Sequence, residues 1–389
     1  MRSIVALLTL VILISCKEVQ KSPSLVTDTV ENKDLNQIKY AEGFSIHEAD
    51  NFITITIKNP WPGSDESFSY ELKRKGLSPE EDTITSRPWH ETGFQKILKF
   101  PVESVVVTST THIPSLDMLG VTDKLVGFPN LDYISSERAR ALISEGKIKE
   151  LGQNEAINTE VLIDLSPDVV VTFAVDGTNK TVENIKNAGI PVLYNADWTE
   201  KHPLGKAEWI KFFGVLFDKQ KEADSIFNEI EAEYLRVVEI AKKAKHKPTV
   251  LSGAMYKDVW YMPQGDSWAA KFIEDANGEY LWKDSEGTGS LSMSLESVLE
   301  KGQNAEFWIG PGQFTSVAQF EEAHSVYLEF EALQAGKVFT STLRKGETGG
   351  ILYYELAPNR PDLVLKDIVK IMHPDLLPDH ELFFFSKVE

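Results

Sequence analysis

"NTEVLIDLSPDVVV" (residues 158–171) and "SLESVLEKGQNAEFWIG" (residues 294–310) are two stretches with the same layout, and they decide the fold that this sequence predicts. Each opens with a small polar residue, one intervening residue and a glutamate. An apolar-periodic segment, a polar break and a hydrophobic run follow. Asn158 and Ser294 suit a helix N-cap, and each hydrophobic run suits a buried strand. We therefore predict two similar lobes that face one cleft.

Short hydrophobic runs alternate with helical segments on both sides of these stretches. In the first lobe, residues 101–202, the runs are 104–110, 169–173 and 191–195. In the second lobe, residues 247–389, they include "PTVLSGAMY", "DVWYMPQ", 306–310 and 337–341, and the lobe closes with the helical stretch "RPDLVLKDIVKIMHP". This alternation predicts a doubly wound α/β fold in each lobe, with a mainly parallel sheet covered on both faces.

Residues 203–246 are predicted to form connecting helices between the lobes. Apolar residues recur at three- and four-residue intervals from Ala223 to Ala241, which is the period of an amphipathic helix. About 25 residues at 1.5 Å each give a rod of roughly 38 Å. Because no Pro or Gly occurs between Lys219 and Lys245, we expect a stiff helix and only modest lobe closure. The alternative is a long surface helix of a single domain.

Residues 37–100 favour strands, because "FITITIK" at 52–58 alternates apolar and polar side chains before the break at 60–63. We expect a small N-terminal β extension there.

The N-terminus has the pattern of a secretion signal. Residues 1–15 place one arginine before an apolar stretch too short to span a bilayer, and Cys16 follows in a lipobox-like setting. We expect Cys16 to be lipidated and residues 16–36 to form a flexible tether. A plain signal peptide or a short membrane helix with an incidental cysteine is the alternative.

Composition and motifs exclude several classes of function. A net charge of −19 without a basic stripe argues against nucleic-acid binding. Phosphate-loop, dinucleotide-binding, nucleophile-elbow and zinc-protease motifs are absent from the sequence, and its histidines form no helical pair. We therefore expect no enzyme, no resident cofactor and no metal ligands. A surface-anchored hydrolase and an adhesive lipoprotein stay as alternatives of other classes.

As a set, these features resemble the helical-backbone (class III) solute-binding lipoproteins of bacterial ABC importers, which carry ferric siderophores, cobalamin or haem. "SPDVVV" at 166–171 and the C-terminal "RPDLVLKDIVKIMHPDLLPDHELFFF" are similar to motifs of that family, and the likeness covers residues 101–389. The resemblance implies a monomer on the periplasmic side of a bacterial membrane or on the cell surface. Its partners would be a permease dimer with its ATPase, and its cargo a metal chelate, most readily a ferric siderophore.

The resemblance also assigns a role to Glu160 and Glu296, one in each lobe, as carboxylates that dock into arginine pockets of the permease. The simpler explanation is that each carboxylate stabilises its helix N-terminus by about 0.3 to 1 kcal/mol.

Ligands of open α/β sheets bind beyond the carboxyl ends of the strands. A metal chelate suits aromatic walls with a cation, and Arg344 is the cation we predict. His112 is a candidate for approaching the metal, although a lone histidine is more often a structural polar group. The full set of predicted ligand-binding residues is Thr111, His112, Phe128, Asn130, Phe173, Trp198, Trp260, Tyr261, Trp268, Arg344, Tyr353 and Tyr354.

Overall fold

The computed structural model describes residues 37–49, 52–73, 97–154 and 156–389. The predicted signal segment, Cys16 and the tether lie outside these ranges.

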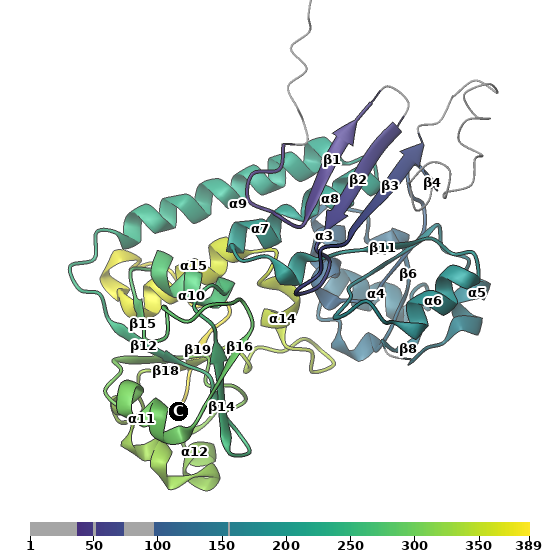
Figure 1. The fold of residues 1–389 in the computed structure, drawn as a ribbon. Helices are drawn as coiled ribbons and strands as arrows, with labels where there is room; N and C mark the ends of the chain where they lie inside the picture. The colour runs from purple at the N-terminus through teal and green to yellow at the C-terminus, as the bar shows by residue number, and fades with distance from the viewer. Residues whose placement is uncertain (1–36, 50–51, 74–96, 155) are drawn as a thin grey trace, which may run out of the picture. The chain divides into compact units, whose positions relative to one another are not determined.

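A four-stranded sheet forms the N-terminal extension (Figure 1), in the order β1-β2-β3-β4. Its strands are β1 (Phe44–Glu48), β2 (Phe52–Lys58), β3 (Ser67–Lys73) and β4 (Ile97–Lys99). The first three pair antiparallel, and β4 joins β3 in parallel. Along β2, Ile53, Ile55 and Ile57 are fully buried, because alternate side chains point to the same face. The predicted β extension is confirmed.

The first lobe is built on a five-stranded parallel sheet in the order β11-β10-β5-β6-β7. Its strands are β5 (Val105–Val107), β6 (Leu125–Phe128), β7 (Lys149–Glu150), β10 (Val169–Thr172) and β11 (Val192–Tyr194). Its helices are α3 (Ile113–Met118), α4 (Glu137–Ser144), α5 (Thr159–Leu165) and α6 (Lys180–Asn187), and a hairpin pairs β8 (Gly152–Gln153) with β9 (Ala156–Ile157). The strand order reverses between β10 and β5, and this switch point is where such sheets bind ligands.

The connecting helices are α7 (Pro203–Glu208), α8 (Ile210–Leu216) and α9 (Gln220–Ala241). The predicted period is confirmed in α9, whose buried side chains are Ala223, Phe227, Ile230, Tyr234, Val237 and Ala241. With 22 residues, α9 is about 33 Å long, slightly shorter than expected.

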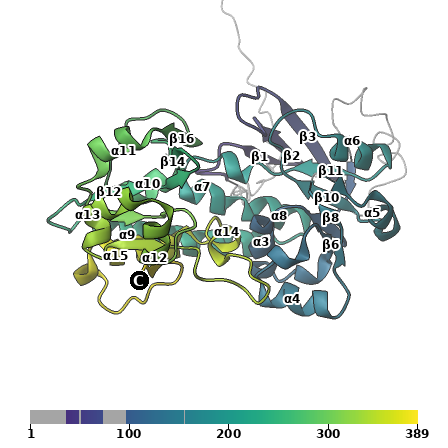
Figure 2. The same ribbon diagram turned by 90° about the horizontal axis from the view of Figure 1, so that it is seen from below.

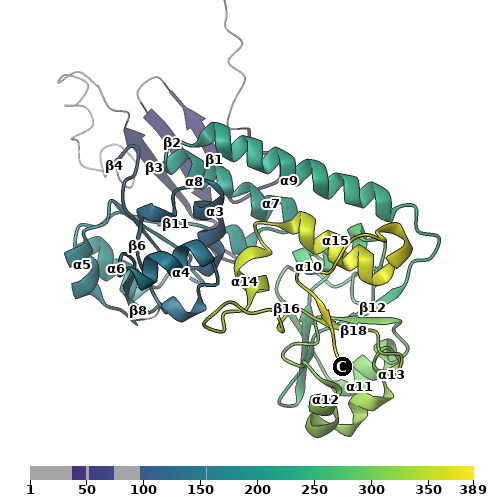
Figure 3. The same ribbon diagram turned by 180° about the vertical axis from the view of Figure 1, so that it is seen from behind.

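The second lobe has its own five-stranded sheet in the order β15-β12-β17-β18-β19, parallel except for β19. Its strands are β12 (Thr249–Ser252), β15 (Glu279–Tyr280), β17 (Phe307–Ile309), β18 (Val338–Thr340) and β19 (Ser386–Lys387). Its helices are α10 (Trp268–Asp275), α11 (Leu295–Gly302), α12 (Val317–Ala323), α13 (Glu331–Gln334), α14 (Leu352–Leu356) and α15 (Pro361–Met372). Helix α14 contacts α3 of the first lobe (Figure 2), and α15 packs along α9 (Figure 3).

One part of the second lobe departs from the predicted parallel pattern. β13 (Ala254–Tyr256), β14 (Val259–Pro263) and β16 (Ser290–Met293) form a separate antiparallel sheet. The run "PTVLSGAMY" is therefore two strands, β12 and β13, which part at Gly253. Gly253 has φ +78°, and a Cβ there would lie 2.0 Å from the carbonyl oxygen of Tyr261, so only glycine fits this corner.

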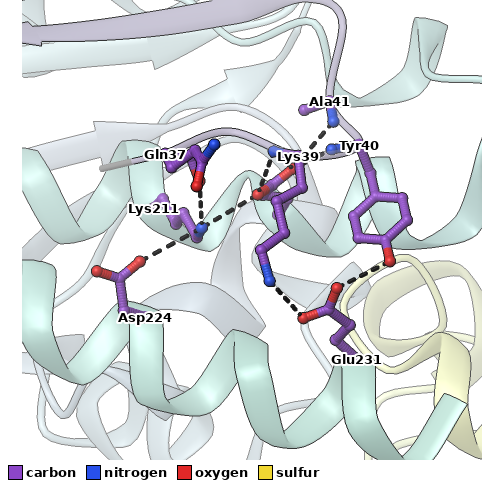
Figure 4. Close-up of polar contacts among 8 residues, drawn as sticks. Gln37, Lys39, Tyr40, Ala41, Lys211, Asp224 and Glu231 are labelled. Carbon is purple, nitrogen blue, oxygen red and sulfur yellow. Dashed lines mark hydrogen bonds and ion pairs between the residues drawn. The ribbon is translucent and has the colours of Figure 1, made fainter. Parts of the chain in front are cut away.

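Two buried carboxylates hold the segment that precedes β1. Glu208 accepts hydrogen bonds from the backbone N–H groups of residues 39, 40 and 41, and Glu200 accepts those of residues 42 and 43. Nearby, Lys211 bridges Glu208 and Asp224, and Glu231 binds Lys39 and the Tyr40 hydroxyl (Figure 4). The β extension is thus attached to the connecting helices by charged hydrogen bonds, which are about twice as strong as neutral ones.

Direct hydrogen bonds join the two lobes through the segment around α14. The Asn359 side chain accepts a bond from the Ser115 hydroxyl at 2.8 Å and donates one to the carbonyl oxygen of Thr111 at 2.7 Å. Glu355 accepts the backbone N–H of Ser135 at 2.6 Å. These contacts bring α14 and the start of α15 against the first lobe.

Candidate ligand-binding cleft

A cavity of about 920 Å³ lies at the carboxyl ends of the second lobe's central strands. Ser252 and Ile309 close β12 and β17, and Ser341 follows β18, so three neighbouring strands deliver residues to one edge. Helices α10, α12 and α14 and strands β13 and β14 of the small antiparallel sheet also contribute to the wall. The volume is in the range of pockets that hold drug-sized ligands.

Aromatic side chains dominate this cavity. Trp268 and Tyr353 are half-buried in its wall, while Tyr256, Tyr261 and Tyr354 are 67%, 41% and 57% exposed. Exposed rings concentrated in one hollow are unusual on a surface without a binding role, because burying them elsewhere would stabilise the fold.

A smaller cavity of about 270 Å³ lies between the lobes. The first lobe contributes residues that follow its strands, and the second lobe contributes Gly350, Ile351 and Tyr354. Asn154 also lines it, and its side-chain oxygen is buried without a hydrogen-bond partner. The larger cavity is lined by second-lobe residues alone, and Tyr354 lines both cavities, so the two adjoin at this side chain. We call the two cavities together the inter-lobe cleft.

The structure brings six of the predicted ligand-binding residues to the inter-lobe cleft. Tyr261, Trp268, Tyr353 and Tyr354 line the larger cavity, and Phe128, Phe173 and again Tyr354 line the smaller one.

Trp260 does not reach either cavity. It is fully buried, its indole N–H donates to the carbonyl oxygen of Ser252 at 3.1 Å, and its ring stacks on Trp308 at 5.4 Å. Successive residues of β14 point to opposite faces, so Tyr261 faces the cavity and Trp260 faces the core.

His112 is completely buried, packs 5.6 Å from the Phe213 ring, and has neither ring nitrogen hydrogen-bonded. Burial lowers the pKa of His112 to about 4, because the charged imidazolium is poorly solvated there. The residue is therefore a neutral core side chain at physiological pH and does not line the cleft.

The remaining predicted residues also lie outside the cavity walls. The Arg344 guanidinium donates to the carbonyl oxygen of Leu382 at 2.8 Å, and the Thr111 hydroxyl donates to Asp197 at 2.9 Å. Asn130 has a left-handed backbone with φ 59°, and Trp198 is 39% exposed away from both cavities.

Several lining residues were not predicted from the sequence, and they lie on β13, in the loop after β17 and on α12. They are Met255, Tyr256, Gln313, Phe314, Gln319 and Glu322. The signal for Gln313 and Phe314 was present in the sequence, because they lie in the loop that follows Ile309, the last residue of β17. Tyr256 was missed because "PTVLSGAMY" has the pattern of one strand.

Glu160 and Glu296 occupy equivalent places in the two lobes. Each lies in the first turn of its helix, α5 or α11, and both are exposed. The caps are Asn158, which accepts the N–H of Val161, and Ser294, which accepts the N–H of Ser297. Hydrogen bonds from its own backbone N–H and from Ser294 lower the pKa of the Glu296 carboxyl.

Two kinds of feature are absent from the described residues. None of the helices in the described part of the chain is both long and apolar enough to cross a membrane. Within residues 37–389, gaps excepted, no three His, Cys, Asp or Glu side chains gather in a way that could hold a metal ion.

Comparisons with known proteins agree with this architecture. Residues 105–342 match a family model described as "Periplasmic binding protein". An uncharacterized lipoprotein of Methanocaldococcus jannaschii is 26% identical over 374 residues, which covers 92% of this chain and 87% of the relative.

Two solved structures share the fold. A periplasmic binding protein of Veillonella parvula has 16% identity and a TM-score of 0.55, with 91% of this chain and all of that chain covered. A possible iron-binding (periplasmic solute-binding) protein of Staphylococcus epidermidis has 17% identity and a TM-score of 0.53, with 70% and 99% covered.

Proposed function

We propose that this chain, which belongs to the periplasmic binding protein family, captures a metal chelate in the inter-lobe cleft and delivers it to an ABC importer. The family consists of solute-binding proteins that work with a permease and an ATPase, and not of enzymes. A ferric siderophore is the cargo we favour, and cobalamin or haem is the alternative within the same family.

The observation that carries this proposal is the concentration of exposed rings around a cavity of about 920 Å³ at the strand ends. Metal chelates present broad organic faces, and stacking on aromatic side chains is an efficient way to bind them. The description of the Staphylococcus epidermidis protein as possibly iron-binding supports a metal-containing cargo.

We further propose that Cys16 carries a lipid anchor, which the lipoprotein relative in Methanocaldococcus jannaschii supports. Acyl chains add about 0.8 kcal/mol per buried CH₂, so the protein would stay at the membrane surface. Cys16→Ala should move the protein from the membrane fraction to the soluble fraction, and unchanged partitioning would refute the anchor.

Glu160 and Glu296 are the proposed contacts to the permease. Both are exposed at matched helix starts, one in each lobe, so a two-subunit partner can engage both at once. Replacing both by Ala should leave ligand binding intact and abolish transport. Glu300→Ala, on an exposed position of α11, is the matched control, and unchanged transport in the double variant would refute the docking role.

Tryptophan fluorescence tests the cargo. Titrations should cover ferric siderophores, cobalamin and haem, with metal-free chelators as controls. Trp268 lines the cavity, whereas Trp198 is exposed elsewhere, so Trp268→Phe should remove the largest share of the quenching and Trp198→Phe little of it. No saturable quenching by any of these chelates would refute the proposed function.

A further inference from the structure

The walls of the inter-lobe cleft carry little charge. Among the described residues that line its two cavities, Glu322 is the one charged side chain. Apart from the tyrosines, the other polar side chains carry hydroxyls or amides: Ser252, Gln313, Gln319, Ser341 and Thr342 in the larger cavity, and Thr108, Ser109, Thr110 and Asn154 in the smaller one.

The cations near the larger cavity are either occupied or at its rim. Lys206 is buried behind Trp268, 5.1 Å from the ring centroid, and its ammonium donates to the carbonyl oxygen of Asp197 at 2.8 Å. The Arg344 guanidinium is bound to Leu382. Lys257 lies over the Tyr256 ring at 5.4 Å but is itself exposed, so solvent and salt screen its charge.

Lys206 and Lys257 already lie over Trp268 and Tyr256, so any preference for positive charge comes from the other tyrosine rings of the wall, Tyr261, Tyr353 and Tyr354. Aromatic faces carry the negative part of the ring quadrupole, and a cation over such a face gains about 0.5 to 2 kcal/mol. The Glu322 carboxylate adds attraction of the same sign, which solvent and salt weaken because Glu322, like Lys257, is exposed. A polyanion that bound against this wall would lose its hydration without pairing with a cation of the lining, and this loss of hydration costs binding free energy.

We propose that the inter-lobe cleft selects an electrically neutral or cationic metal chelate with a broad apolar face, and discriminates against polyanionic chelates. This inference rests on the proposed function and narrows its cargo. Chelates of the hydroxamate type and neutral corrinoids satisfy it. Tris-catecholate complexes, with three negative charges, and haem, with two carboxylates, do not.

Equilibrium binding to the purified protein tests the selection by charge. The probes are ferric desferrioxamine B, which has a cationic pendant amine, its neutral N-acetyl derivative, cyanocobalamin, the ferric complex of enterobactin and haem. We expect at least one neutral or cationic probe to bind about tenfold or more tightly than both anionic probes. Tighter binding of either anionic probe would overturn this inference while leaving the proposed function in place. Absence of binding by every probe would instead refute the proposed function.

Glu322 supplies a finer test, because it is exposed and its replacement should not disturb the fold. Glu322→Gln should weaken the binding of ferric desferrioxamine B by about two- to fivefold, the size expected for an exposed ion pair. The affinity for the N-acetyl derivative should stay unchanged. The loss should shrink in high salt. Glu321→Gln, the exposed neighbour that does not line the cavity, is the matched control. Equal losses for both chelates, or no loss for the cationic one, would overturn the contribution of Glu322.

Discussion

Replacing Glu355 by Gln should stabilise the protein at alkaline pH. Glu355 lies on α14 with 3% of its surface exposed, and it accepts the backbone N–H groups of Ser135 and Ser136 at the start of α4. Burial raises the pKa of its carboxyl from 4.5 to about 7, despite these two hydrogen bonds. Nearby Asp117 raises this pKa further by repulsion.

The direction and size of the effect follow from this pKa. Between pH 4.5 and about pH 7 the folded protein keeps a proton that the unfolded chain has released, so stability falls as pH rises through that window. At roughly 1.36 kcal/mol for each pKa unit, the full loss above pH 7 is on the order of 3 kcal/mol. Gln resembles the protonated carboxyl, because it offers one acceptor and a donor without a charge. The variant should therefore match the wild type near pH 5 and exceed its stability at pH 8 by about 1 to 3 kcal/mol.

Urea unfolding at pH 5, 6, 7 and 8 measures this difference. Glu347→Gln, an exposed position on the same segment, is the control and should change neither the midpoint nor its pH dependence. Equal destabilisation of Glu355→Gln at pH 5 and pH 8 would show that its charge state does not govern this contact, and would refute the reasoning.

Three further predictions concern two aromatic side chains, a buried carboxylate and a glycine corner. Tyr261→Ala should weaken chelate binding with little change in the urea midpoint, because the ring is 41% exposed in the cavity, whereas Trp260→Ala should cost about 3 to 5 kcal/mol of stability as a large core truncation. If Trp260→Ala weakened binding more, and Tyr261→Ala lowered stability more, the placement of Tyr261 in the cavity and Trp260 in the core would be wrong. Glu208→Gln should lower the free energy of unfolding by about 3 kcal/mol and accelerate tryptic cleavage after Lys39. Lys211 loses a buried anionic partner, and three backbone N–H groups lose a charged acceptor. An unchanged rate of cleavage in this variant would show that Glu208 does not hold the segment before β1. Gly253→Ala should lower the thermal midpoint strongly, because its Cβ would lie 2.0 Å from a carbonyl oxygen, and a wild-type midpoint would contradict the corner geometry.

Elements with a strong local period could be predicted from the sequence. The alternation in residues 52–58 predicts β2 with the bounds that it has, and the apolar spacing in residues 223–241 predicts the buried face of α9. Both signals are local, because period 2 and period 3.6 reflect which side chains share a face. The repeated layout at 158 and 294 likewise corresponds to capped helices α5 and α11 in the two lobes.

Features that depend on one backbone angle or on distant partners could not be predicted in this way. The corner at Gly253 turns one apparent strand into two, and Tyr256 was therefore not predicted to line a cavity. The sequence could not show which of the neighbouring aromatic residues Trp260 and Tyr261 is buried, since alternation along β14 defines two faces but not which face meets the core. The hydrogen bonds of Asn359 and Glu355 join residues more than 200 positions apart, so no local pattern contains them.

Helix α14 lies both in the wall of the candidate cleft and in the contact between the lobes. Tyr354 lines both cavities of the inter-lobe cleft, and the next residue, Glu355, binds the first lobe. Adjacent residues on a helix face different directions, so one short helix presents a ring to the cleft and a carboxylate to the other lobe. Opening the lobes at this edge would break the Glu355 bonds and those of Asn359, each worth about 0.5 to 3 kcal/mol. Because α9 also lacks Pro and Gly, the same reasoning favours small rotations about α14 over a wide hinge when the cleft takes up its ligand.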